Sequence, residues 1–224
     1  MDEVKVIEIK KSIFDDNNKM ADELREYLKK NKCLLINLMS SPGAGKTTTL
    51  IKIINLLKSK LKIAIMEADI DSDVDTKKII NSTGVDAIQL HTGGMCHLDA
   101  EMTKQGLDNL NLDKYDLIFL ENVGNLVCPA EFDTGANFNM MILSIPEGDD
   151  KPLKYPLMFS ICDLVVFNKI DTLPYFDFDV NKCEEYVHSR NKNSTILKIS
   201  AKTGEGCDKL ADYIYTKVNE LKGE

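Results

Sequence analysis

Apolar residues recur along this chain at two spacings, which predict helices and strands in alternation. Residues 17–31 carry Met20, Leu24 and Leu28 at intervals of four among charged positions, as in an amphipathic helix. Leucines and isoleucines between 50 and 57 keep a helical spacing too. Short uninterrupted apolar runs predict buried strands, and these lie at 33–39, 61–66, 117–120, 140–145, 164–167 and 195–199.

The order of these elements predicts an α/β fold, a doubly wound, mostly parallel sheet flanked by helices. Strands that are apolar throughout have both faces covered, and helical segments separate several of them. With 224 residues and 43% hydrophobic content, the chain can bury one large core. We therefore expect one domain over 32–224, with an N-terminal helix within 1–31 packed on it. In such a fold, ligands bind at the carboxyl ends of the strands.

The first strand end carries a phosphate-binding loop. The segment SSPGAGKTT lies between a predicted strand and a predicted helix, and it matches GxxxxGK[ST] except that Ser40 replaces the first glycine. In such a loop the backbone amides turn toward a polyphosphate, Lys46 reaches its β and γ oxygens, and Thr47 offers a hydroxyl to Mg2+. The predicted phosphate-binding residues are Ser41, Pro42, Gly43, Ala44, Gly45, Lys46, Thr47 and Thr48.

Another strand end carries residues suited to reading guanine. Asn168, Lys169 and Asp171 form the motif NKxD directly after the apolar run 164–167. The Asp171 carboxylate can accept hydrogen bonds from guanine N1–H and N2–H2, whereas adenine would leave it unpaired, so we expect GTP and GDP as ligands. By resemblance to GTPases, the second guanine-contacting loop consists of Ser200, Ala201 and Lys202.

Carboxylates at strand ends are candidates for binding Mg2+ and for orienting the attacking water. Asp69 and Asp75 follow the second predicted strand. Glu121 closes the third within ENVG, which resembles the DxxG loop of GTPases with Glu in place of Asp. The sequence leaves open which carboxylate orients the water. The predicted magnesium residues are Thr47, Asp75 and Glu121, and the predicted catalytic residues are Lys46, Asp69 and Asp75.

Cysteine and histidine residues on the nucleotide side suggest a nickel or zinc site. Cys96, His97 and Cys128 lie in two loops that leave strands at that side, and thiolate and imidazole suit either metal. One chain offers at most three ligands with poor geometry, so a dimer sharing the site would complete it. On spacing alone, buried cysteines beside a surface histidine are an equal alternative. The remaining cysteines have apolar or helical neighbours and are interpreted as structural: Cys33, Cys162, Cys183 and Cys207.

Six segments together resemble one family. SSPGAGKTT, CHLDAEM, ENVGNLVCPAEFD, EGDD, NKID and SAKTGEG follow one another between residues 40 and 206, and closely resemble the nickel-incorporating hydrogenase maturation GTPases, the HypB family. The resemblance implies a P-loop G domain that hydrolyses GTP, dimerises with GTP and helps insert nickel into the [NiFe]-hydrogenase precursor. It also implies a zinc-containing nickel chaperone as a partner. In that family the residues matching Cys96, His97 and Cys128 bind metal at the dimer interface, and the lysine matching Lys154 reaches the partner's nucleotide.

Two other functions stay open at this stage. The chain could be a nickel or zinc binding module in which GTP only sets the dimer, or a related GTPase serving another metallocentre such as urease. Urease relatives carry a Cys-Pro-His triplet in one loop, whereas this chain splits its ligands between two loops, which favours hydrogenase. Turnover should be slow, because the motif loops contain no arginine.

The overall charge narrows the range of partners. Lys and Arg number 28 against 36 Asp and Glu, a net charge of −8 that matches a phosphate backbone poorly, so we expect no nucleic-acid partner. The sequence has neither an apolar run of about 18 residues nor a signal-peptide core, so we expect no membrane association. With six cysteines and no secretory signal, reduced thiols and a cytoplasmic location are expected.

Overall fold

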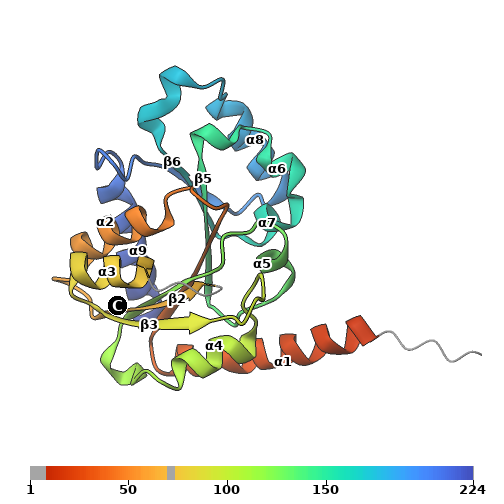
Figure 1. Ribbon diagram of the computed structural model, residues 1–224, viewed down its shortest axis with the longest axis vertical. Coiled ribbons are helices and arrows are strands. Elements are labelled where there is room, and N and C mark those ends of the chain that lie inside the picture. The colour runs from red at the N-terminus through yellow and green to blue at the C-terminus, as the bar shows by residue number, and fades with distance from the viewer. Residues whose placement is uncertain (1–8, 70–73, 224) are drawn as a thin grey trace, which may run out of the picture.

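Seven strands form one fully parallel sheet at the centre of the molecule (Figure 1). The computed structural model describes the backbone of residues 9–69 and 74–223, and the side chains from Phe14 onward except that of Asp69. The strand order is β3-β2-β4-β1-β5-β6-β7, which confirms the predicted α/β class. The strands are β1 (Leu34–Ser40), β2 (Ile63–Asp69), β3 (Asp86–His91), β4 (Leu117–Glu121), β5 (Phe138–Ser144), β6 (Leu164–Asn168) and β7 (Thr195–Lys198).

Helices cover both faces of the sheet. One apolar cluster joins the strands to α2 (Lys46–Leu57), α3 (Val74–Thr83) and α9 (Cys207–Lys222) on one face. Two clusters lie on the other face, one beneath α1 and α4, the other beneath α5, α7 and α8. The helices of that face, with the short α6 beside them, are α1 (Ile9–Lys30), α4 (Ala100–Leu107), α5 (Cys128–Glu131), α6 (Lys151–Lys154), α7 (Pro156–Ile161) and α8 (Val180–Arg190). Three 3-10 helices complete the described part: Leu112–Lys114, Ile145–Glu147 and Ile170–Tyr175.

Six strands lie where the apolar runs predict them, and β3 is one that the runs miss. Its residues Asp86–His91 mix polar and apolar types, and the strand is exposed at both ends and only partly buried between them, because β3 is an edge strand of the sheet. A search for continuous apolar runs passes over β3 because Asp86, Gln89 and His91 interrupt its apolar residues, whereas the other edge strand, β7, carries a run that the search finds. Across the sheet, β4 lies next to β1 on one side, followed by β2 and then β3. On the other side of β1 lie β5, β6 and β7, in that order.

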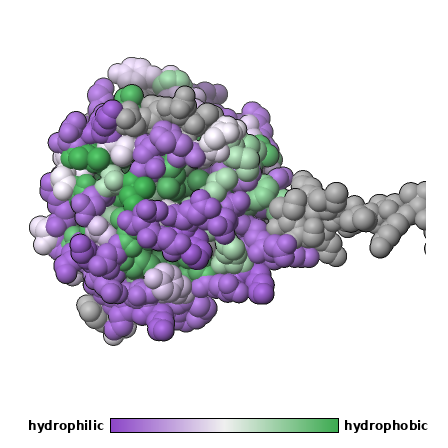
Figure 2. All heavy atoms as spheres, turned by 60° about the horizontal axis from the view of Figure 1, so that its bottom comes forward, coloured by the Kyte–Doolittle hydropathy of each residue, from purple (hydrophilic) through white to green (hydrophobic). Residues whose placement is uncertain are grey.

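Helix α1 lies beside α4 at the edge of the domain, and its N-terminal end extends past the rest of the fold (Figure 1). Its apolar stripe is Ala21, Leu24 and Leu28, all buried, and Leu24 and Leu28 share a cluster with β1 and β4 residues. Gly135 lies directly against this stripe, because a Cβ added to it would lie 2.8 Å from Leu24 Cδ2. Figure 2 turns the bottom of Figure 1 toward the viewer, and this face carries hydrophobic patches between larger hydrophilic areas. The buried leucines of α1 therefore belong to the same core as the strands.

Leu28→Ala tests this packing. Leu28 is fully buried, so the truncation removes apolar burial and leaves a cavity, and we expect the free energy of unfolding to fall by about 2–5 kcal/mol. Chemical denaturation measures it, with Lys29→Ala, an exposed neighbour, as the control. A loss below about 0.5 kcal/mol for Leu28→Ala would show that α1 is not part of the core.

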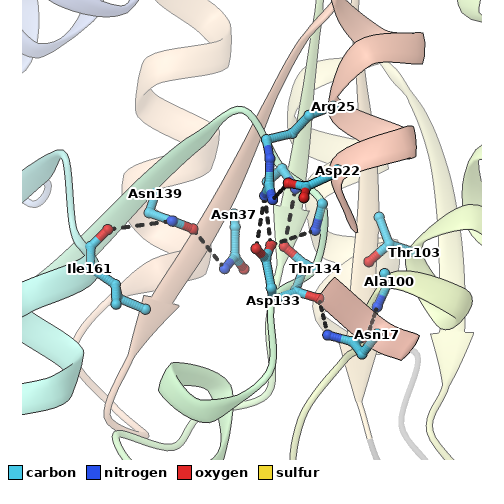
Figure 3. Close-up of polar contacts among 12 residues, drawn as sticks. Asn17, Asp22, Arg25, Asn37, Ala100, Thr103, Asp133, Thr134, Asn139 and Ile161 are labelled. Carbon is cyan, nitrogen blue, oxygen red and sulfur yellow. Dashed lines mark hydrogen bonds and ion pairs between the residues drawn. The ribbon is translucent and has the colours of Figure 1, made fainter. Parts of the chain in front are cut away.

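Three asparagines form a polar row across the middle of the sheet. Asn122 donates to Asn37 Oδ1 at 3.1 Å, and Asn37 donates to Asn139 Oδ1 at 3.1 Å. Asn139 then donates to the Ile161 carbonyl at 3.4 Å (Figure 3). The row fixes the start of the loop after β4, the loop that contains Cys128, because buried amides without partners are costly.

Candidate functional site

The carboxyl ends of the central strands open into a cavity of about 410 Å³ at the start of α2. Helix α2 begins at Lys46, after Gly45 in a left-handed conformation with φ of 102°, and no side chain caps it. Its first backbone N–H groups are therefore available to a ligand, which makes this helix end suited to phosphate. The cavity is lined by Pro42, Gly43, Gly45, Lys46, Thr47, Thr48, Asp75, Lys78, Glu121 and Gly124.

Ser40 takes over the position of the first motif glycine without obstructing the loop. It is fully buried at the end of β1, and its hydroxyl donates to the Ser41 carbonyl at 2.7 Å. The Lys46 ammonium in turn donates to Ser40 Oγ at 3.2 Å. The serine thus holds the Lys46 ammonium beside the cavity, where a bound phosphate can accept a hydrogen bond from it instead.

The predicted magnesium residues line the same cavity. Thr47, Asp75 and Glu121 come from α2, α3 and the end of β4, and Glu121 is buried. One hydroxyl and two carboxylates near a phosphate site form an all-oxygen donor set, which is the kind that Mg2+ prefers. The side chain of Asp69 lies outside the described part, as do Asp71 and Asp73, interpreted from sequence as a solvated loop.

Lys78 is a cavity residue that sequence reasoning missed. It follows Asp75 by three residues on α3, so the two side chains share one face of the helix. The sequence feature that could have revealed Lys78 is its position three residues after Asp75, which was already assigned to the site. Lys78 adds a second lysine, in addition to Lys46, to the lining of the phosphate cavity.

The guanine-reading motif is tied directly to the phosphate loop. Asn168 Nδ2 donates to the Ala44 carbonyl at 2.9 Å, and Lys169, in a left-handed conformation with φ of 64°, donates to the Gly43 carbonyl at 2.7 Å. A Cβ on Gly45 would lie 2.6 Å from Asn168 Nδ2, so only glycine fits there. The two loops therefore form one continuous nucleotide surface.

The loop that begins at Ser200 holds the motif from the other side. Ser200 Oγ donates to Asp171 Oδ1 at 2.6 Å, and the Ala201 backbone amide donates to Asn168 Oδ1 at 3.1 Å. Lys202 is exposed in the same turn. The Asp171 carboxylate is thus oriented before any base binds, which lowers the ordering cost of recognition.

The two predicted metal-binding cysteines come together although 32 positions separate them in the sequence. A hydrogen bond with Cys128 is the largest cause that raises the pKa of the Cys96 thiol, so the two sulfur atoms are neighbours. Cys96 Sγ lies 3.9 Å from His97 Nδ1. Over residues 14–69 and 74–223, leaving out the Asp69 side chain, no three His, Cys, Asp or Glu side chains are grouped closely enough to hold a metal ion. That two copies of the chain complete a metal site, of which each supplies only a part, stays a prediction.

His97 is held more tightly than a surface histidine. Its ring is stacked on Phe132, with centroids 3.8 Å apart and planes 14° from parallel, and only 7% of the residue is exposed. Burial lowers the pKa of His97, which favours the neutral imidazole that binds metals. Its Nε2 is buried and, within the part of the chain that the structure describes, makes no hydrogen bond.

The loop after β4 connects the phosphate cavity to the cysteines. Gly124 lies against the phosphate loop, because a Cβ on it would come within 3.2 Å of Pro42 Cγ and 3.3 Å of Pro42 Cα. Cys128 follows four residues later, at the start of α5. Only three residues therefore lie between Cys128 and the contact of Gly124 with the phosphate loop.

Lys154 lies beside this loop and outside the phosphate cavity of its own chain. It forms an ion pair with Asp150 at 2.6 Å and lines a small cavity of about 170 Å³ with Val127 and Leu157, both half exposed. Its predicted contact with a nucleotide requires a second copy of the chain, and stays a prediction.

Comparison with known proteins places this geometry in a family. Residues 34–198 match the family model described as CobW/HypB/UreG, nucleotide-binding domain. The chain belongs to this family. Hydrogenase maturation factor HypB of Escherichia coli strain K12 is 42% identical over 217 residues, covering 97% of this chain and 74% of the relative. The hydrogenase/urease maturation factor HypB of Helicobacter hepaticus is 40% identical, covering 95% of this chain and 88% of the relative.

A solved structure agrees with the sequence relatives. HypB from Helicobacter pylori, determined in complex with nickel, superposes with a TM-score of 0.86 at 36% identity, covering 92% of this chain and 96% of that one. The fold, the resemblance to HypB and the nucleotide-binding character predicted from the sequence are thereby confirmed. The roles of the individual residues rest on the geometry described above.

Proposed function

We propose that this GTPase binds nickel and helps insert it into a [NiFe]-hydrogenase precursor, with metal binding coupled to the bound nucleotide. The observation that supports it most directly is the short connection from the phosphate loop through Gly124 to Cys128. A relative of the same fold was determined in complex with nickel, and another is named for hydrogenase maturation.

Hydrolysis of GTP to GDP and phosphate is mainly a matter of positioning and charge. Lys46 and the first amides of α2 bind the phosphate oxygens, and Lys78 adds positive charge at the same cavity. Thr47 with Asp75 or Glu121 would hold Mg2+, which would neutralise phosphate charge. Either Asp69 or Asp75 orients the attacking water. Asp171, oriented by Ser200, selects guanine.

The metal site is completed by a second copy of the chain. Cys96 and Cys128 supply paired thiols and His97 a neutral imidazole, a donor set suited to nickel and also to zinc. Two copies placed face to face would double these donors and bring Lys154 to the partner's nucleotide. All six cysteines are free, which a thiolate site requires and which suits the cytoplasm.

The proposed partners are the nickel chaperone of the same pathway and the hydrogenase large-subunit precursor. Nickel passes from the first to the second through this site. Within the described residues, no helix combines the length and the apolar character needed to cross a bilayer.

Nickel titration of the GDP and GTP-analogue forms tests the coupling. We expect the nickel Kd to differ between the two forms by roughly 5-fold to 150-fold, because Cys128 moves with the loop that contacts the phosphate end. By linkage, nickel must change the affinity for the nucleotide by the same factor. Isothermal titration calorimetry measures both, with sedimentation velocity reporting dimerisation.

Cys128→Ser is the matching variant. It should lose most nickel binding and retain GTP binding, while Cys183→Ala, which removes a buried thiol elsewhere, should retain both. Equal nickel isotherms in the two nucleotide forms would contradict the coupling and leave a GTPase with a separate metal site. Unchanged nickel binding in Cys128→Ser would remove that cysteine from the site.

A further inference from the structure

Helix α1 is attached to both loops that carry the proposed metal ligands. Asn17 Nδ2 donates to the Asp133 carbonyl at 2.9 Å, and Asn17 Oδ1 accepts from the Ala100 backbone amide at 3.0 Å (Figure 3). Ala100 lies three residues after His97, and Asp133 lies five residues after Cys128. One side-chain amide thus bridges two loops that are remote in the sequence.

A second contact fixes the Cys128 loop to the same helix. Arg25 Nη1 donates to both carboxylate oxygens of Asp133, at 2.8 and 2.9 Å, and Arg25 Nη2 donates to Asp22 Oδ1 at 2.7 Å. Asp133 Oδ1 also accepts from the Gly135 amide at 2.8 Å. With Gly135 packed on Leu24, the end of this loop cannot shift without moving α1.

An aromatic stack links the helix to the histidine itself. The Phe14 ring lies 5.0 Å from the Phe132 ring, and Phe132 is stacked on His97 at 3.8 Å. Phe132 immediately precedes Asp133, so the same anchored segment that α1 holds also sets the plane of the imidazole.

We propose that α1 is a clamp that positions the metal ligands, with Asn17 as its central positioning residue. The clamp rests on the proposed nickel site, since it fixes the loops of Cys96, His97 and Cys128 relative to one another. The clamp also holds one end of the segment that would couple the nucleotide to the metal site. The segment from Gly124 to Asp133 touches the phosphate loop at its start and is held by α1 at its end, so a displacement at Gly124 must be taken up between them, where Cys128 lies.

Asn17→Leu tests the clamp, with Asn18→Leu as its matched control. Leucine keeps a side chain of similar volume and removes both hydrogen bonds of Asn17, whereas Asn18 is exposed on the same helix. The first readout needs no metal. A short bifunctional thiol reagent cross-links Cys96 to Cys128, and the cross-linked peptide is quantified by mass spectrometry. We expect the rate to fall at least about 5-fold in Asn17→Leu and to stay at the wild-type value in Asn18→Leu.

The second readout is nickel itself. Contacts that orient metal ligands typically change metal affinity 10- to 100-fold, so we expect the Ni2+ Kd of Asn17→Leu to rise by about tenfold or more. The sulfur-to-nickel charge-transfer absorption should shift, and the difference between the GDP and GTP-analogue forms should shrink. The GTP affinity measured without nickel should stay unchanged.

Phe132→Leu keeps the test decisive if Asn17→Leu unfolds. This variant keeps an apolar side chain beside His97 and removes the stacking, so it should raise the nickel Kd without altering the cross-linking of the cysteines. A folded Asn17→Leu protein with wild-type cross-linking and wild-type nickel binding would overturn the clamp. If wild type binds no nickel but Asn17→Leu still slows cross-linking, the clamp stands and the proposed function fails.

Discussion

Replacing Lys46 by alanine is expected to lower the GTP hydrolysis rate at saturating GTP by roughly 100-fold or more. The variant removes the ammonium that Ser40 holds beside the phosphate cavity, and removing one preorganised charge-stabilising donor costs about this much in other enzymes. The fraction of bound GTP cleaved, followed in acid-quenched samples under single-turnover conditions, measures it, because quenching makes the readout independent of product release.

The control for Lys46→Ala is Lys60→Ala, which removes an exposed lysine just beyond α2. It should hydrolyse GTP at the wild-type rate. Lys46→Arg separates charge from shape, since the guanidinium keeps the charge and cannot occupy the same position. Wild-type turnover in Lys46→Ala, with the protein shown to be folded, would eliminate the proposed hydrolytic mechanism.

The second large effect is expected at Asp171. In Asp171→Asn one carboxylate oxygen becomes an amide nitrogen, so a donor faces the N1–H and N2–H2 donors of guanine. Losing one hydrogen bond to a charged group costs about 1.5–3 kcal/mol, and leaving a buried donor unpaired costs about 1–3 kcal/mol more, which together predict a fall in GTP affinity of roughly 100-fold or more. Xanthine presents an oxygen where guanine has its amine, so XTP should become the preferred nucleotide.

Competition titrations of GTP, XTP and ATP against one fluorescent nucleotide measure this change of preference. Asp177→Asn, an exposed carboxylate six residues later, should keep the wild-type order. Equal affinity of the wild-type protein for ATP and GTP would show that Asp171 does not read the base.

The fold was accessible from the sequence because most strands of this sheet are buried on both faces. Residues 34–40, 117–121 and 164–168 are apolar nearly throughout and are fully buried, so a simple search for apolar runs locates them. The edge strand β3 lacks that signal, since Asp86, Gln89 and His91 interrupt its apolar residues. The strand follows Gly84, whose φ of +72° marks the end of α3, and this turn was the available clue.

The nucleotide site was accessible for a different reason. Phosphate and guanine binding depend on backbone conformation, and therefore on short contiguous motifs such as GAGK and NKID. The contacts that surround the cysteines are not of this kind. Asn17 and Phe132 act on residues up to 116 positions away, through one bridging amide and one ring face, and no spacing within the sequence encodes such contacts.

The contact between Gly45 and Asn168 restricts how this protein can evolve. The amide that braces the guanine-reading motif fills the space that any larger side chain at position 45 would need, and it also holds the phosphate loop at Ala44. A substitution at either position disturbs base selection and phosphate binding at once. Mutational paths to a different nucleotide are therefore expected to begin at Asp171, whose side chain can change while this pair stays intact.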